Sequence, residues 1–415
     1  MAKFDAILQK WTDARNGSIH GASFVAYDST GKCLYSGAQG SRTVDRSTNV
    51  PATTHDLCWL ASQTKLVTAV AAMQMIERGL IGIDDDVGKV VPQLASKEVI
   101  AGFEGDETQS GKELNPATLL YDFQNPRKPI LRKATKPISL RYLLTHTSGF
   151  AYDFTSEELC EYLAFHGVDV GERNSLEKYN TPLIFEPGTK FRYGVGTDWA
   201  GHVVERLSGK NLNAYIQENI CARLGMKNTT FFPDTEPGRF GPELDLAFRS
   251  DGPKGSLVKG SVPPTWRPAK EALGGAGLYS TADDYGLFLK ALVSGGGPLL
   301  KKETLDLMFT GTVANREDLT GQTRGVFRNF MAQDLLPDTE VDYCPGGLVS
   351  LTPVSGRRAE GSIKWGGSSN PLWWIDMRNG VAGTMMTQIQ PPADSAANDL
   401  FVELEEQVYK SIGKA

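Results

Sequence analysis

The distribution of apolar and polar residues predicts strands near both ends of the chain and helices in its middle. Apolar residues recur at helical spacing over residues 3–15 and again over residues 400–412, which predicts an amphipathic helix near each end. Five other segments read as strands, because they lie between turn residues such as DSTG and RNG. These segments are residues 21–28, 32–40, 360–367, 371–377 and 380–390.

The simplest arrangement of these elements is one antiparallel sheet to which both chain ends contribute, covered by the first and last helices. We therefore predict an α/β (α+β) fold in a single unit of 415 residues. Its α/β lobe is expected at about residues 1–60 and 280–415, and an all-helical lobe at about residues 61–279. The polar, turn-rich stretch 103–136 is expected to be a surface excursion.

One predicted helix begins with a polar cluster. Residues 58–79, CWLASQTKLVTAVAAMQMIERG, place Ser62 and Lys65 at the start of an otherwise apolar helix. Residues three apart share one face of a helix, so the amine is expected beside the hydroxyl. A lysine that is shielded from water can lose its proton near neutral pH and activate a serine. The helix N-terminus would also favour negative charge that develops there.

The S-x-x-K pattern leaves a second interpretation open, in which Ser62 is an ordinary N-cap and Lys65 a solvated residue of the first turn. Of five such matches, only this one opens a long apolar helix. The other four begin at Ser29, Ser175, Ser256 and Ser411. The hydrolase patterns G-x-S-x-G and H-E-x-x-H do not occur in the sequence. His146, in LLTHTSG, is a candidate either to partner a serine or to cap its own helix.

Composition and charge narrow the class of protein. The chain is 40% apolar and 22% charged, and its net charge of −6 comes without a basic stripe, so neither nucleic acid nor an anionic membrane is an expected partner. We find no apolar run of the roughly 18–20 residues that a membrane span needs, and no signal-peptide pattern. The five cysteines and five histidines are scattered. We therefore expect a cytoplasmic protein without disulfides, metal or cofactor.

Four blocks of sequence together carry a resemblance to a known family. In order, they are WLASQTKLVTAVAAMQMIERGLIGIDDDV, ISLRYLLTHTSGF, FEPGTKFRYG and GGAGLYSTADDYGLFLKAL. They resemble the serine β-lactamase and penicillin-binding-protein superfamily, in its class C-like esterase and transesterase branch. The resemblance covers roughly residues 5–412. It implies a β-lactamase/transpeptidase-like fold with the active site between the two lobes.

The resemblance also implies roles for three residues. Ser62 matches the acylated nucleophile and Lys65 its paired base. Tyr193, in FRYG, matches the tyrosine of the family's Y-x-N element, which would pass protons between the nucleophile and the leaving or attacking group. The Pro-Gly turn before Tyr193 favours this role over that of a packed loop aromatic. The Asn of this element is replaced by Val195.

The family's K-[ST]-G strand is altered here to Trp365-Gly366-Gly367, followed by Ser368. Trp365 replaces a lysine that grips carboxylates, and its indole has a large face without charge. We therefore expect neutral, apolar acyl or alcohol groups as substrates rather than β-lactams or peptides. The backbone N–H groups of Ser62 and Ser368 form the expected oxyanion hole, and the two glycines would let a carbonyl approach the strand. A plain β-turn at GGSSN is the alternative.

Residues near these motifs are candidates to line acyl and acceptor pockets. They are Tyr152, Trp266, Trp365, Gly366, Gly367 and Trp373. Core packing is an equal alternative for Tyr152 and Trp266. Trp373 and Trp374 alternate along one strand, so only one of them can face the site. The excursion at 103–136 would form either a rim over the cleft or a plain surface loop.

These observations predict serine-dependent acyl transfer through an acyl-enzyme. Ser62 would attack a small-molecule ester or thioester, and an alcohol of a small apolar secondary metabolite would then accept the acyl group. An acyl carrier protein or coenzyme A is a candidate carrier of the donor thioester. A carboxylesterase, in which water attacks the same intermediate, is the first alternative. An inactive scaffold that only binds a ligand is the second.

Overall fold

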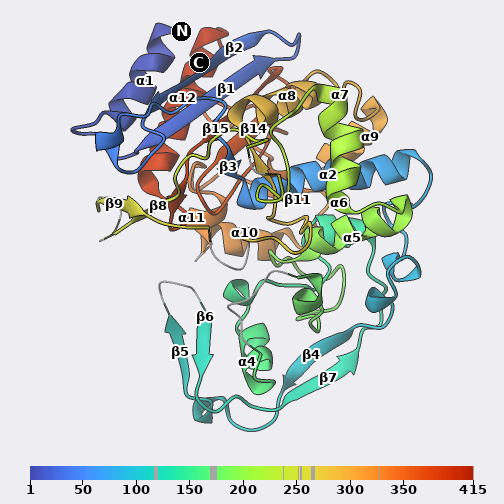
Figure 1. Ribbon diagram of the computed structural model, residues 1–415. Coiled ribbons are helices and arrows are strands. Elements are labelled where there is room, and N and C mark those ends of the chain that lie inside the picture. Colours follow the sequence, from blue (N-terminus) through green and yellow to red (C-terminus); the bar gives the residue numbers. More distant parts are fainter. Residues whose placement is uncertain are drawn as a thin grey trace.

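A seven-stranded antiparallel sheet forms the centre of the computed structural model (Figure 1). The structure describes residues 1–115, 120–168, 175–236, 238–250, 252, 255–262, 267–325 and 327–414. The strand order is β11-β12-β13-β14-β15-β1-β2. The strands are β1 (Gly21–Asp28), β2 (Cys33–Gly40), β11 (Val341–Cys344), β12 (Gly347–Ser350), β13 (Ile363–Gly366), β14 (Leu372–Asp376) and β15 (Val381–Met386). Strand β1 pairs with β15, so both chain ends build one sheet, as the pattern predicts.

Helices cover both faces of this sheet. On one face, α1 (Ala2–Thr12) packs beside α12 (Ser395–Ser411) over a core that includes Phe24 and Trp374 (Figure 1). On the other face, α8 (Ala282–Val293) crosses β1 and β15. The core on that side contains Trp373 and continues into the helical part of the molecule. Because Trp373 and Trp374 point to opposite faces, only Trp373 is on the side of the helices that carry the predicted site.

The helical part surrounds α2 (Thr64–Glu77), which is buried along almost its whole length. Such a helix is apolar on every side because every side meets protein. It packs against α5 (Gly196–Ser208) and α6 (Leu212–Ile216), and α3 (Leu140–Leu144) packs against α5. Helix α6 runs through a π-turn into α7 (Ala222–Leu224). Helix α4 (Glu157–Phe165) lies further out. Ser139 caps α3 by accepting the N–H of Tyr142.

The middle of the chain also contains strands, which differs from the all-helical lobe expected there. Two antiparallel ribbons project from it at the bottom of Figure 1. They are β4 (Glu98–Phe103) with β7 (Pro129–Lys133), and β5 (Lys112–Asn115) with β6 (Leu120–Phe123). Strand β5 is exposed throughout, so it lacks the apolar alternation by which a strand is recognised in a sequence. The division into two lobes stays a prediction.

Several short elements complete the fold. Strand β3 (Cys58–Trp59) pairs with β10 (Tyr279–Ser280), and β8 (Ala247–Arg249) lies between β9 (Leu257–Lys259) and β16 (Ile389–Gln390). Helices α9 (Lys302–Phe309), α10 (Arg316–Arg324) and α11 (Arg328–Met331) precede β11. Within the ranges described above, no helix has the length and hydropathy that a membrane span requires.

Candidate active site

Ser62 lies in a tight turn between β3 and α2. The turn is a 3₁₀ helix, Ala61–Gln63, and Ala61 has φ +45°, a left-handed conformation that is costly for a residue with a side chain. Thr64 fixes the turn, because its Oγ1 donates to the Ala61 carbonyl at 2.6 Å and accepts the Leu278 N–H at 3.1 Å. Ser62 is not the N-cap of α2, since that position is Gln63.

The structure brings the three predicted catalytic residues into one buried group. The Tyr193 hydroxyl lies 2.7 Å from Ser62 Oγ, and Lys65 Nζ lies 3.3 Å from the same oxygen. Lys65 Nζ also donates to the Gly275 carbonyl at 2.7 Å. Only 7% of Ser62, 6% of Lys65 and 2% of Tyr193 is exposed. Lys65 is therefore not the solvated first-turn residue of the alternative interpretation.

Tyr152 also belongs to this group. Its hydroxyl accepts a hydrogen bond from Lys65 Nζ at 3.1 Å, and its ring lies 5.4 Å from that of Tyr193. The amine of Lys65 is thus held between two phenols and lies over both rings, 4.7 Å from that of Tyr193 and 5.2 Å from that of Tyr152. The sequence analysis names Tyr152 only as a residue that could line a pocket. The hydrogen bond to its hydroxyl shows that Tyr152 also lies beside Lys65 in the buried group.

Asp198 is a member of the site that the sequence analysis missed. It lies in the first turn of α5, is buried, and accepts the Gly275 N–H through Oδ1 at 2.8 Å. Burial raises the pKa of Asp198 to about 6, although the Lys65 charge, the Gly275 N–H and a hydrogen bond from Tyr152 oppose this rise. An acidic residue in the first turn of a helix is common, so nothing in GVGTDWAG distinguishes it.

The HTSG and FRYG motifs lie side by side and hold Tyr193 in place. The carbonyl of His146 accepts the Arg192 N–H at 2.9 Å, and its Nδ1 accepts the Gly194 N–H at 3.3 Å. The imidazole ring lies edge-on to Tyr193, 4.6 Å between centroids. Burial lowers the pKa of His146 well below its usual value, and the Lys65 charge lowers it further. His146 is therefore neutral and supports Tyr193. Among the residues that the structure describes it bonds to no serine, and the C-cap of α3 is Thr145.

The end of β13 supports the same group from the sheet. Trp365 Nε1 donates to the Tyr193 hydroxyl at 3.4 Å, the two rings lie 5.2 Å apart, and 4% of Trp365 is exposed. Gly367 abuts the turn that carries Ser62: a Cβ at this position would lie 2.2 Å from the Leu60 carbonyl oxygen. Only glycine allows the strand to come this close.

The chain turns directly after Gly367, beside the turn that carries Ser62. The Gly367 N–H donates to Pro371, on the β14 side, at 2.9 Å. Ser368 follows in the turn after β13, in which the Asn370 N–H donates to the Gly367 carbonyl at 2.8 Å. In the described part of the chain, neither the Ser62 N–H nor the Ser368 N–H has a backbone or side-chain acceptor. Both groups are therefore available to an oxyanion, and the oxyanion hole stays a prediction.

The remaining residues predicted to bind a substrate lie in the core, at a pocket, or outside the described residues. Trp373 pairs with Trp365 across β13 and β14 and is buried in the core on the same face. Trp266 lies outside the described residues. Gly366 and Gly367 line a pocket at the end of β13, together with Trp365. The roles of these residues in binding a substrate stay predictions.

The fold and the buried Ser-Lys-Tyr group together define a class of serine enzymes. The chain belongs to the β-lactamase family, which matches residues 4–407. Its relatives at 30% identity or more include acyltransferases and an esterase, and the chain is an enzyme of this kind.

Three comparisons describe this kinship. The chain is 33% identical to a lovastatin esterase of Penicillium rubens, over 94% of this chain and 93% of that protein. It is 32% identical to a monacolin J acid methylbutanoyltransferase of Aspergillus terreus, over 95% and 92%. A simvastatin synthase structure from Aspergillus terreus superposes with a TM-score of 0.87 at 31% identity, over 100% and 98%. The blocks LLTHTSGF and ETLDLMF predict this likeness to the fungal lovastatin side-chain acyltransferase, and the comparisons confirm it.

Proposed function

We propose that this enzyme transfers an acyl group from an ester or thioester to an alcohol of a small, apolar secondary metabolite, with Ser62 as the nucleophile. One observation carries the proposal: Ser62 Oγ lies 2.7 Å from a phenol and 3.3 Å from an amine, in a group shielded from solvent. A hydroxyl needs such a neighbour to lose its proton as it attacks.

The first half-reaction makes the acyl-enzyme. Ser62 Oγ attacks the carbonyl carbon of the donor, and its proton passes to Tyr193 or Lys65. The Ser62 and Ser368 N–H groups would stabilise the oxyanion of the tetrahedral intermediate. When the carbon–oxygen or carbon–sulfur bond breaks, the leaving alcohol or thiol takes up the proton. Asp198 and Tyr152 hold Lys65 and the Gly275 carbonyl in position for this transfer.

The second half-reaction is the reverse with a new alcohol. Tyr193 or Lys65 takes the proton of the acceptor hydroxyl, whose oxygen attacks the acyl carbon, and Ser62 leaves with that proton.

The likeness to the monacolin J acid methylbutanoyltransferase favours a secondary-metabolite alcohol as acceptor. We propose an acyl carrier protein or coenzyme A thioester as donor. All five cysteines are free, which supports the expected cytoplasmic location.

Hydrolysis by the same site is the second candidate. The likeness to the lovastatin esterase favours it, at an identity almost equal to that of the transferase. Both reactions share the acyl-enzyme, so only the attacking group separates them. Trp365, in place of the family's lysine, lowers the polarity of the site for either reaction.

Butyryl-coenzyme A, supplied with and without 1-hexanol, tests the proposal. We expect intact mass to show a butyryl adduct on the wild type and none on Ser62→Ala, and hexyl butyrate to accumulate when the alcohol is present. Butyric acid as the sole product would overturn transfer in favour of hydrolysis. A wild type that is acylated neither by this thioester nor by p-nitrophenyl butyrate would support the inactive scaffold.

A further inference from the structure

Two phenylalanine rings lie against the tyrosines of the candidate active site. Phe154 stacks on Tyr152, two residues before it, with 5.1 Å between the ring centroids. Phe330, on α11, lies 5.7 Å from Tyr193. The two phenylalanine rings meet edge-on at 6.3 Å, and the two tyrosine rings lie 5.4 Å apart. The four rings therefore form a closed cycle, of which both tyrosines belong to the buried group of the site.

The phenylalanines form the outer half of this cycle. Only 4% of Tyr152 and 2% of Tyr193 is exposed, whereas Phe154 and Phe330 are partly buried. The hydroxyl of Tyr193 contacts Ser62 Oγ at 2.7 Å. On this side of the site, the two phenylalanine rings therefore lie between the tyrosines that serve the nucleophile and the solvent.

The turn that carries Phe154 is fixed to the segment of Tyr193. Thr155, the residue after Phe154, donates from Oγ1 to the Tyr193 carbonyl at 2.9 Å. The Arg192 side chain donates to the Thr155 carbonyl at 2.7 Å. The Phe154 ring therefore has a fixed place beside the residue that we propose to transfer the proton.

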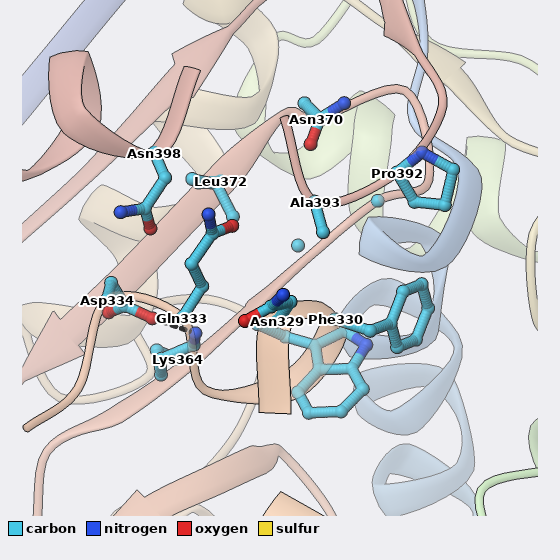
Figure 2. A pocket seen from close by; sticks show the side chains of 13 residues that line it. Asn329, Phe330, Gln333, Asp334, Lys364, Asn370, Leu372, Pro392, Ala393 and Asn398 are labelled. Atoms are coloured by element: carbon cyan, nitrogen blue, oxygen red, sulfur yellow. Dashed lines mark hydrogen bonds and ion pairs between the residues drawn. The ribbon is translucent and has the colours of Figure 1, made fainter. Parts of the chain in front are cut away.

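Phe330 reaches the cycle from a separate element. It lies at the edge of the pocket at the end of β13, and Figure 2 shows it away from the ion pair of Asp334 and Lys364. Its ring contacts Tyr193 and Phe154 instead. An edge-on pair of rings is a weak contact, so the two phenylalanines can separate to admit a substrate and close again over the acyl-enzyme.

We propose that Phe154 and Phe330 form an apolar cover over the acyl-enzyme, which limits attack by water and so sets the share of acyl groups that reach an alcohol. The inference rests on acyl transfer as the proposed function and concerns its competition with hydrolysis. Water and an alcohol break the same bond, between Ser62 Oγ and the acyl carbon, and each gives up one proton that returns to Ser62. An apolar alcohol gains contacts with the rings, whereas water loses hydrogen bonds when it enters beneath them.

The division of one acyl-enzyme between two products tests this inference. The enzyme is supplied with p-nitrophenyl butyrate and 1-hexanol, and hexyl butyrate and butyric acid are measured in the same mixture. Both products come from the butyryl-enzyme, so their ratio does not depend on the rate of acylation. We expect Phe330→Ala and Phe154→Ala each to lower the ratio of ester to acid by roughly 2- to 10-fold.

Matched variants control for the loss of a ring as such. Phe330→Tyr keeps the ring and should keep the wild-type ratio. Phe327→Ala removes a partly buried ring directly before α11, outside the cycle, and should keep the ratio as well. The variant with both alanines should resemble the single variants, because opening one side already opens the cover. Phe330→Leu, which loses only the ring, replaces Phe330→Ala if circular dichroism shows that the alanine variant does not fold.

The lifetime of the butyryl adduct without 1-hexanol gives a second measure. Intact mass should show that the adduct decays roughly 2- to 10-fold faster in the alanine variants than in the wild type, because water then reaches the ester. An unchanged lifetime would overturn the cover even if the ester share falls, since the rings would then only bind the alcohol. An unchanged ratio in both alanine variants would overturn it too.

These outcomes separate the cover from the proposed function. A wild type that forms butyric acid alone would overturn acyl transfer, and the lifetimes of the adduct would still decide whether the rings exclude water. A wild type that forms no adduct would overturn both.

Discussion

Replacing Asp198 with asparagine should raise the stability of the folded protein at neutral pH and lower its acylation rate. The folded state raises the pKa of this carboxyl from 3.8 to about 6 because the group is buried. The folded state then binds the proton more tightly than the unfolded state, so this contribution to stability is complete below about pH 4 and is lost as pH rises through 6. A difference of about two pKa units corresponds to about 3 kcal/mol.

Asparagine removes this pH-dependent loss and keeps an oxygen that can accept the Gly275 N–H. Relative to the wild type, the free energy of unfolding of Asp198→Asn should therefore rise by about 3 kcal/mol between pH 4 and pH 7. Urea unfolding at several pH values measures the difference, and the exposed Asp399→Asn serves as control. A stability difference between Asp198→Asn and the wild type that stays constant over this range would refute the reasoning.

The activity of the same variant should move in the opposite direction. Without the carboxylate, the Gly275 carbonyl and Tyr152 are held less firmly against Lys65. Misplacement of a catalytic group by a fraction of an ångström to 1 Å can cost up to about 100-fold in rate, so we expect acylation by p-nitrophenyl butyrate to slow roughly 10- to 100-fold. If the folded variant is acylated at the wild-type rate, Asp198 has no role in positioning Lys65.

Two further substitutions test other parts of the site. Tyr193→Phe removes the hydroxyl 2.7 Å from Ser62 Oγ and should slow p-nitrophenol release by about 100-fold or more. Circular dichroism should show an unchanged fold. A loss of rate below about threefold would contradict the role of Tyr193 in proton transfer. Gly367→Ala should lower the free energy of unfolding by about 1–3 kcal/mol, because its Cβ would lie 2.2 Å from the Leu60 carbonyl oxygen. Thermal unfolding measures this, with Gly321→Ala, which has open space around it, as the control that should lose no stability.

The sequence predicted most of what depends on local pattern. The sheet shared by both ends followed from apolar segments between turns, and the start of α2 followed from one polar cluster in an apolar helix. Ser62 and Lys65 are three residues apart, so helix geometry alone placed them together. Tyr193 is remote in sequence, and only its resemblance to a family motif linked it to Ser62.

The features that the sequence did not predict depend on tertiary contacts. Asp198 reads as an ordinary first-turn acid, and its buried place beside Gly275 depends on how α5 packs on α2. Tyr152 was a candidate for a pocket wall, yet its hydroxyl reaches Lys65 because HTSG and FRYG pair side by side. Strand β5 pairs with β6 while exposed to water, so hydrophobic patterning carries no information about it.

The pairing of β1 with β15 has a consequence for biosynthesis. Ser23 meets Met386 in that ladder, so the first hairpin to leave the ribosome must wait for nearly the whole polypeptide before its open edge is covered. Contacts between such distant segments form slowly and leave strand edges open to other chains meanwhile. Trp365, on β13, and Gly367, directly after it, support the turn and the tyrosine beside Ser62. A chain that ends before residue 360 lacks both residues, so its Ser62 has no support from the sheet.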